Sequence, residues 1–171
     1  MIRLCQYRAV FICLLLSLAG CSTTGSSDPS SLNFRMPEGS KLVLNRDVSI
    51  SASYSHANFQ NGEQTPGVDE YTINCSLEQR DLGPGTIVPD SFLITNFSSS
   101  REWINQPHTM RFYKMIRLRS ERQPGIMRME CGYWDGPMIG RPVTLTDIQQ
   151  ALGDIFTFEF AAPAPAPAPA P

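Results

Sequence analysis

The sequence predicts a mainly β domain, a small antiparallel sandwich or barrel, with one C-terminal helix before a closing strand. Three observations support this fold class. Apolar and polar residues alternate over several short runs, turn-forming pairs such as Asn-Gly and Pro-Gly separate these runs, and one late segment has helical periodicity. Between its low-complexity ends the chain has about 130 residues, which is enough for one domain with a core but short for two.

The first strands are expected between residues 41 and 79. Apolar residues alternate with serines over residues 48–55, which predicts a strand with one buried face. After the turn signals Asn61-Gly62 and Thr65-Pro66-Gly67, the alternation returns over residues 70–79 and predicts the next strand.

Three further strands are expected over residues 91–97, 109–119 and 126–134, where apolar side chains again recur with period two. Pro89 precedes the first of them, a position at which a strand tolerates proline. Pro124-Gly125 separates the last two, so we expect these strands to pair as a hairpin.

The predicted helix begins after Thr144, which stands three residues before Asp147 in the spacing of a capping box. Its apolar face consists of Ile148, Ala151, Leu152 and Ile155, and Gly153 is a natural stop. Phenylalanines then alternate with polar residues from position 156 to position 160, which predicts the closing strand.

The first residues of the chain have the composition of a secretory leader. Arg3 and Arg8 precede an apolar run over residues 9–16 that is too short to span a bilayer. The run ends in Leu18-Ala19-Gly20-Cys21, which resembles the lipobox of bacterial lipoprotein signal peptides. An ordinary signal peptide with Cys21 as an incidental thiol is the alternative.

This resemblance implies that Cys21 becomes the acylated first residue of the mature chain, carrying palmitate-like chains that hold the protein on a membrane. Residue 22 is serine rather than the aspartate that marks inner-membrane retention. The resemblance therefore implies an outer-membrane protein that faces the periplasm.

Four segments follow from this interpretation. Residues 1–20 are the signal peptide, residues 21–31 the lipidated cysteine and a flexible Ser/Thr/Gly tether, residues 32–160 a single β-rich domain, and residues 161–171 a disordered Pro-Ala tail. The tail favours extended polyproline II and is either a low-complexity end or a docking strand for an envelope partner. A tether of about ten residues spans only about 16–19 Å, so the domain should lie close to its membrane.

Cys75 and Cys131 are the cysteines expected to remain besides Cys21. Both occupy the apolar positions of alternating runs, and thiols in an oxidising compartment usually pair, so we expect a disulfide between them. A redox or metal pair is the alternative, but the chain has no Cys-x-x-Cys motif and only two histidines.

Charge and motifs exclude several function classes. Cleavage removes Arg3 and Arg8 but no acidic residue, so 14 basic residues become 12 against 16 acidic ones and the net charge is −4. This balance argues against a nucleic-acid partner. The sequence has no nucleophile elbow, zinc-protease or phosphate-loop motif, and His56 and His108 look like loop or surface residues. We expect no enzymatic activity, no cofactor and no metal site.

A basic strand is the first candidate binding surface. Arg111, Tyr113, Arg117 and Arg119 share one face of the strand over residues 109–119, and three further basic residues, Lys114, Arg122 and Arg128, lie nearby. Such a stripe suits anionic lipid headgroups, lipopolysaccharide phosphates or an acidic envelope protein. A solvated face, with Arg117 or Arg119 paired to Glu130 or Glu78, is the alternative.

Two tryptophans are the second candidate. Trp134 is expected at a hairpin tip and Trp103 in a loop, where aromatic rings can stack on sugars or anchor a protein interface. A tryptophan that caps the end of the core is the alternative. Together these features predict a non-enzymatic, outer-membrane-anchored binding or assembly module, with a structural lipoprotein that uses its Pro-Ala tail, or an envelope hydrolase, as alternatives.

Overall fold

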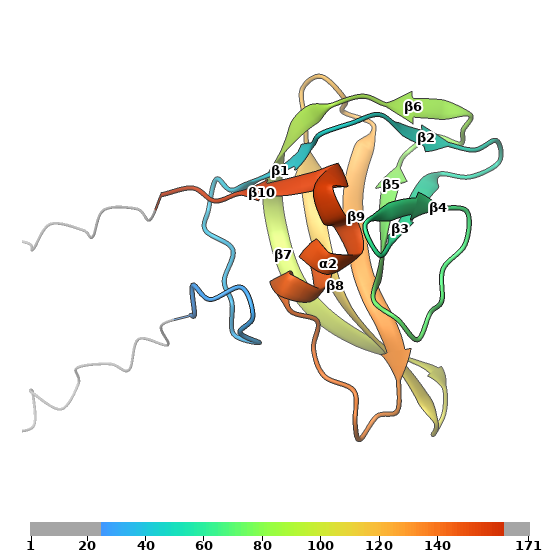
Figure 1. Cartoon of the computed structure of the whole chain (residues 1–171), viewed down its shortest axis with the longest axis vertical. Coiled ribbons are helices and arrows are strands. Elements are labelled where there is room, and N and C mark those ends of the chain that lie inside the picture. Colours follow the sequence, from blue (N-terminus) through green and yellow to red (C-terminus); the bar gives the residue numbers. More distant parts are fainter. Residues whose placement is uncertain (1–24, 163–171) are drawn as a thin grey trace, which may run out of the picture.

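A computed structural model describes residues 25–162 and shows a mainly β protein (Figure 1). Eight strands form one antiparallel sheet that curls into a half-barrel, and two short strands, β2 (Val48–Ile50) and β6 (Gly85–Ile87), pair separately. The strands of the large sheet are, in spatial order, β10 (Phe156–Glu159), β1 (Lys41–Leu44), β7 (Asp90–Asn105), β8 (Thr109–Arg119), β9 (Ile126–Asp135), β5 (Asn74–Gln79), β3 (His56–Gln60) and β4 (Glu63–Thr65). The predicted fold class is confirmed.

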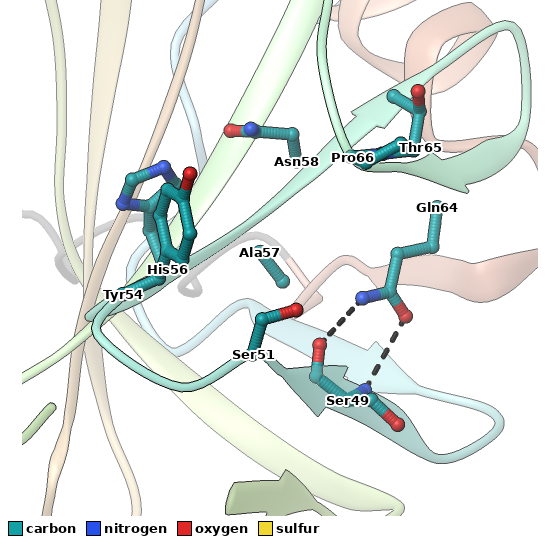
Figure 2. Close-up of a pocket in the computed structure, with 9 residues that line it drawn as sticks. All are labelled: Ser49, Ser51, Tyr54, His56, Ala57, Asn58, Gln64, Thr65 and Pro66. Carbon is teal, nitrogen blue, oxygen red and sulfur yellow. Dashed lines mark hydrogen bonds between the residues drawn. The ribbon is translucent and has the colours of Figure 1, made fainter. Parts of the chain in front are cut away.

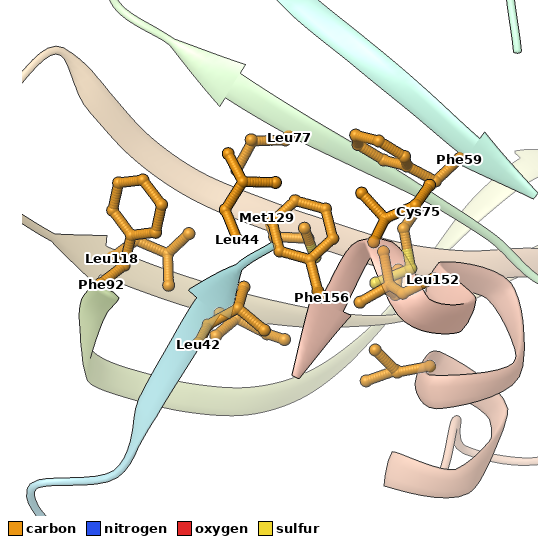
Figure 3. Close-up of a cluster of buried hydrophobic side chains, with 14 of the residues drawn as sticks. Leu42, Leu44, Phe59, Cys75, Leu77, Phe92, Leu118, Met129, Leu152 and Phe156 are labelled. Atoms are coloured by element: carbon orange, nitrogen blue, oxygen red, sulfur yellow. A yellow bond between two sulfur atoms is a disulfide. The ribbon is translucent and has the colours of Figure 1, made fainter. Parts of the chain in front are cut away.

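The core lies inside the curl of the sheet, where helix α2 (Leu145–Leu152) covers β3, β5 and β10. Figure 3 shows Leu, Phe and Met side chains of the strands meeting Leu152 of this helix. Phe59 of β3 and Phe156 of β10 meet edge to face with ring centroids 5.3 Å apart, so side chains join strands that are far apart in the sheet order.

The helix begins as the sequence predicts. The Thr144 hydroxyl accepts a hydrogen bond from the backbone N–H of Asp147, while the Asp147 carboxylate accepts one from the backbone N–H of Thr144. Both ends of the capping box are therefore formed. Gly153 follows the helix at φ +56°, and a short 3-10 turn, Gly153–Ile155, leads into the predicted closing strand, β10.

Strands β8 and β9 pair as the predicted hairpin, but the first expected strand is shorter than its sequence pattern suggested. It ends at Ile50, because Ser53 takes a left-handed conformation at φ +69° and turns the chain. Tyr54 is consequently exposed, although the alternation placed it on the buried face. Strand β5 likewise begins at Asn74 rather than at residue 70, because Asp69 closes a turn by accepting the backbone N–H of Thr72.

Strand β7 is the opposite case. The sequence predicted a strand over residues 91–97, whereas β7 continues to Asn105 and pairs with β8 from Leu93 to Asn105. Most side chains beyond Asn96 are exposed on both faces, so the extension has no buried alternation that sequence reasoning could detect. Backbone hydrogen bonds to β8 hold it.

The N-terminal segment corrects the expected tether. Within the predicted flexible span, residues 26–31 lie on the domain: Ser26 bridges to Phe34, and the Pro29 carbonyl accepts hydrogen bonds from the backbone N–H groups of Leu145 and Thr146. The backbone N–H groups in the first turn of a helix have no partner within the helix, so they are free to donate to the carbonyl of Pro29. Cys21 and most of the Pro-Ala tail lie outside the described residues. Within residues 25–162, helices are too short and too polar to cross a bilayer.

The expected disulfide is confirmed. Cys75 and Cys131 stand opposite each other on β5 and β9, both fully buried, and their sulfur atoms are bonded. The bond joins neighbouring strands beneath helix α2 (Figure 3).

Candidate functional site

The outward face of β8 carries its arginines, but acidic neighbours compensate several of them. Arg111 contacts Glu102 of β7 and Glu130 of β9, with nitrogen–oxygen distances of 3.3 Å to each, and its guanidinium lies 4.6 Å from the centre of the Tyr113 ring. Arg111 and Tyr113 are therefore committed to contacts within the sheet.

Two of the neighbouring basic residues are also paired. Arg128 makes two hydrogen bonds to Glu78 and an ion pair with Glu130 at 3.2 Å; burial opposes its charge, but these contacts prevail and raise its pKa. Arg122 lies 3.6 Å from Asp90. The acidic partners that the sequence suggested for Arg117 or Arg119 are therefore taken by Arg111 and Arg128.

Lys114 belongs to the opposite face, which corrects its place in the expected basic stripe. It follows the inward alternation of β8 and is only 4% exposed. Its ammonium donates a hydrogen bond to the Ser99 hydroxyl at 2.7 Å and lies 4.8 Å from the centre of the Phe97 ring. Burial lowers the pKa of this lysine.

The six candidate binding residues divide into two groups. Arg117 and Arg119 lie exposed near the C-terminal end of β8, where Arg119 lines a shallow hollow with Lys41 and Arg122. Trp103, Arg111, Tyr113 and Trp134 lie toward the other end of the strand. Trp103 pairs with Met110, nine positions from Arg119, which is about 30 Å along a strand.

Neither tryptophan is in a loop. Trp103 lies within β7 and is 45% exposed, whereas Trp134 lies within β9, half-buried, with its ring 5.9 Å from that of Tyr71. The hairpin tip expected at Trp134 does not form, because β9 is followed by a long connection to α2 rather than by a paired strand.

Large apolar side chains collect at this end of the sheet. Trp103 and Ile104 lie near the end of β7, and Met138 and Ile139 lie in the connection after β9. Strand register brings these segments together, since Trp103 stands opposite Met110 and Met110 opposite Asp135. We call Trp103, Ile104, Met138 and Ile139 the apolar end (bottom of the sheet in Figure 1). The signal that sequence reasoning missed is the Met-Ile pair between Pro137 and Gly140.

The connection that carries Met138 and Ile139 is held by contacts at Gly140 and Arg141, the residues that follow this pair. The Tyr133 hydroxyl accepts a hydrogen bond from the backbone N–H of Arg141 and donates one to the Arg141 carbonyl. The Arg141 guanidinium donates two hydrogen bonds, of 2.7 and 2.8 Å, to the Asp147 carboxylate. Gly140 packs so closely on the Phe112 ring that a side chain would clash. The exposed Met138 and Ile139 are therefore presented by a fixed loop.

A polar pocket of about 390 Å³ lies elsewhere, between β2, β3 and β4 (Figure 2). Its lining residues are Ser49, Ser51, Tyr54, His56, Ala57, Asn58, Gln64, Thr65 and Pro66. The Gln64 amide donates to the carbonyl of Ser49 and accepts its backbone N–H, so this side chain joins β4 to the small sheet as a strand would. Sequence reasoning missed the pocket because it depends on the turn at Ser53.

The wall that carries Tyr54 is fixed by backbone contacts. The Tyr54 N–H donates to the carbonyl of Ser51, and its own carbonyl accepts the N–H of Gly83 at 2.6 Å. The ring stands edge-on to His56, with centroids 5.4 Å apart, and is 51% exposed. Gly83 is required here, since a side chain would strike the Ser51 carbonyl.

The polar groups of this pocket are suited to binding by hydrogen bonds. Among the lining side chains, Gln64 alone is hydrogen-bonded to another lining residue, which leaves the Ser51 hydroxyl, the His56 imidazole and the Asn58 amide facing the pocket (Figure 2). The lining contains no carboxylate and no Lys or Arg. Across residues 25–162, three or more His, Cys, Asp or Glu side chains nowhere come close enough to hold a metal ion.

No protein-family model matches this chain, and no curated protein or solved structure matches it either. The chemistry of its own surface is therefore the basis for a functional proposal. Two regions carry that chemistry: the polar pocket beside Tyr54 and the apolar end.

Proposed function

We propose that this chain is a non-enzymatic binding module, lipid-anchored at the outer membrane and facing the periplasm, whose polar pocket binds a short saccharide. The observation that carries the ligand class is the exposed Tyr54 ring, held by a fixed turn beside the Ser51, His56 and Asn58 side chains. The lipobox-like residues up to Cys21 support the anchor.

The pocket suits a sugar for reasons of chemistry. The apolar face of a pyranose stacks on an aromatic ring, and its hydroxyls both donate and accept hydrogen bonds, as the imidazole and amide of His56 and Asn58 also do. A neutral ligand loses less hydration than an ion on entering the pocket, and no charged side chain lines the pocket to compensate an ion for that loss. A volume of about 390 Å³ admits a small ligand of this kind.

The rigidity of the turn that carries Tyr54 also supports a binding role for the pocket. Ser53 holds a left-handed backbone conformation that is costly for a residue with a side chain, at φ +69°. The contacts of Ala52 and Tyr54 with Gly83 compensate this cost. A ring fixed before the ligand arrives loses little conformational freedom on binding.

The pocket is tested by titrating N-acetylhexosamine oligosaccharides into ¹⁵N-labelled protein and following the amides of residues 51–58. We expect saturable shifts in the wild type, and about a tenfold weaker Kd for Tyr54→Ala and for Asn58→Ala. Tyr71→Ala is the matched control, because Tyr71 is also an exposed tyrosine but lies outside the pocket. Absence of shifts at millimolar sugar, or an equal loss in Tyr71→Ala, would contradict the proposal.

The anchor is tested separately by mass spectrometry of the mature N-terminus and by fractionation of a Cys21→Ser variant, which should leave the membrane fraction. The alternatives remain open to the same experiments. Cleavage of the oligosaccharide during titration would favour a hydrolase, although His56 has no carboxylate beside it in the pocket. Loss of the cellular role on deletion of residues 163–171, with sugar binding intact, would favour a structural lipoprotein.

A further inference from the structure

We propose that the apolar end rests in the headgroup region of the membrane that holds the anchor, so that the domain lies on the bilayer in one orientation. This inference rests on the acylated Cys21 of the proposed function but not on sugar binding. Gly25, the first described residue, follows Cys21 by four positions, which span at most about 14 Å even when extended. The flank that carries Gly25 therefore cannot leave the membrane surface.

The apolar end lies toward that flank. The N-terminal segment is hydrogen-bonded at Pro29 to the first turn of α2, and the connection with Met138 and Ile139 leads directly into the same turn. Figure 1 shows all three in the lower half of the molecule: the N-terminal segment at its left edge, this connection at the bottom, and the end of β7 at the lower right. A bilayer that holds Cys21 can thus reach Ile139 without any change in the fold.

The composition of the apolar end suits a lipid interface. The tip of the β7–β8 hairpin, residues 103–110, contains no acidic residue, and residues 136–140 contain no charged residue at all. Glu102 and Asp135 border these two segments, and Glu102 is paired with Arg111. In a mature chain of net charge −4, the segments can therefore enter the headgroups without desolvating a carboxylate of their own. Trp103 with Ile104 and Met138 combines an aromatic ring that favours the interface with aliphatic chains that favour the acyl boundary.

This orientation also frees the pocket. Tyr54 lies two residues before His56, and His56 pairs with Glu78 near the C-terminal end of β5. Asn74 is at the other end of that strand. Asn74, in turn, stands opposite Gly132, close to the apolar end. The polar pocket is therefore displaced from the membrane contact and open to the periplasm.

Two tryptophans in the whole chain make a direct test possible. In the Trp134→Phe background, Trp103 is the single emitter; in Trp103→Phe, the half-buried Trp134 is the matched control. Full-length acylated protein is reconstituted into phosphatidylethanolamine–phosphatidylglycerol vesicles with brominated acyl chains. We expect a blue shift and a loss of about half of the Trp103 emission, but little quenching of Trp134.

Substitution distinguishes lipid contact from mere proximity. Met138→Asp should restore most of the Trp103 emission without lowering Tm, since Met138 is 93% exposed. Leu82→Asp is the control, because Leu82 is also exposed but follows β5 at the opposite end of the sheet, and it should change nothing.

Unquenched Trp103 in protein whose Cys21 is acylated would overturn the inference, and protection of Trp103 only when other envelope proteins are present would assign the apolar end to a protein partner instead. If mass spectrometry finds Cys21 unacylated, the proposed lipid anchor is contradicted, but the membrane contact of the apolar end can still be tested. The same quenching is then measured on unacylated protein with excess vesicles, where quenching supports the membrane contact and its absence overturns it.

Discussion

Gly62 and Gly153 touch where the end of helix α2 meets the β3–β4 turn. The N–H of Gly62, in the β3–β4 turn, donates to the carbonyl of Ala151 at 3.0 Å, and Gly153 ends the helix directly against this turn. A side chain on Gly153 would place its first carbon 2.6 Å from the Gly62 Cα. The contact between these glycines joins α2 to the edge of the sheet that β10 does not reach.

Gly153→Ala should therefore destabilise the protein by about 1–3 kcal/mol, because it adds both a clash and an unfavourable positive φ. Urea unfolding monitored by circular dichroism measures the change. Gly67→Ala is the matched control, since nothing lies within 4 Å of the added carbon, and it should leave the midpoint unchanged. Equal urea midpoints for the two variants would show that the β3–β4 turn shifts to accommodate the added methyl group at no cost in stability.

The Cys75–Cys131 bond should contribute about 4 kcal/mol, as the chain-entropy relation gives for a closed loop of this length. The two cysteines are 56 positions apart and fully buried. The measurement compares the urea midpoints of oxidised and reduced protein, with thiol alkylation under denaturing conditions to count free cysteines. Two alkylated cysteines in native envelope material, or equal midpoints, would contradict the role assigned to this bond.

The elements that could be predicted from the sequence are those with one buried face, because such a face gives a regular pattern of apolar residues. Strands β8 and β9, the capping box at Thr144 and the inward cysteines all follow from alternation or helical spacing, because their burial repeats along the chain. The far half of β7 has no buried face to repeat and was therefore not predicted.

The candidate site was less predictable, because it depends on which residues become neighbours. Arg111 lies on the predicted face, but its charge is balanced by Glu102 and Glu130 from the strands on either side. Tyr54 becomes part of a pocket through a single positive φ at Ser53, which local alternation does not reveal.

Lys114 should destabilise the fold while it is charged, since burial lowers its pKa in the folded state. The unfolded chain then binds more protons between that lowered pKa and the ordinary value of 10.5, so stability should rise with pH across this interval. Lys114→Met should remove the rise and stabilise the protein by about 1–3 kcal/mol at neutral pH.

The Lys114→Met comparison needs urea midpoints from pH 7 to pH 10.5, with Arg117→Met as control. Arg117 lies on the exposed face of the same strand, so its substitution should change neither the midpoint nor its pH dependence. A less stable Lys114→Met protein would mean that the contacts with Ser99 and Phe97 outweigh the loss of hydration.

Asp147 should produce a loss of stability in acid. Burial by itself would raise its pKa, but hydrogen bonds from Arg141 and Thr144 prevail and hold the pKa below the ordinary 3.8. The folded state therefore favours the carboxylate: its contribution is complete above the unfolded value and is lost as pH falls through the folded one. Asp147→Asn should cost about 1–2 kcal/mol at pH 7 and progressively less below about pH 4, measured as urea midpoints. Asp154→Asn, which removes only an exposed ion pair with Arg46, should leave the urea midpoint unchanged both at pH 7 and below about pH 4. A constant difference between wild type and Asp147→Asn down to pH 2 would show that the helix cap does not depend on the charge of Asp147.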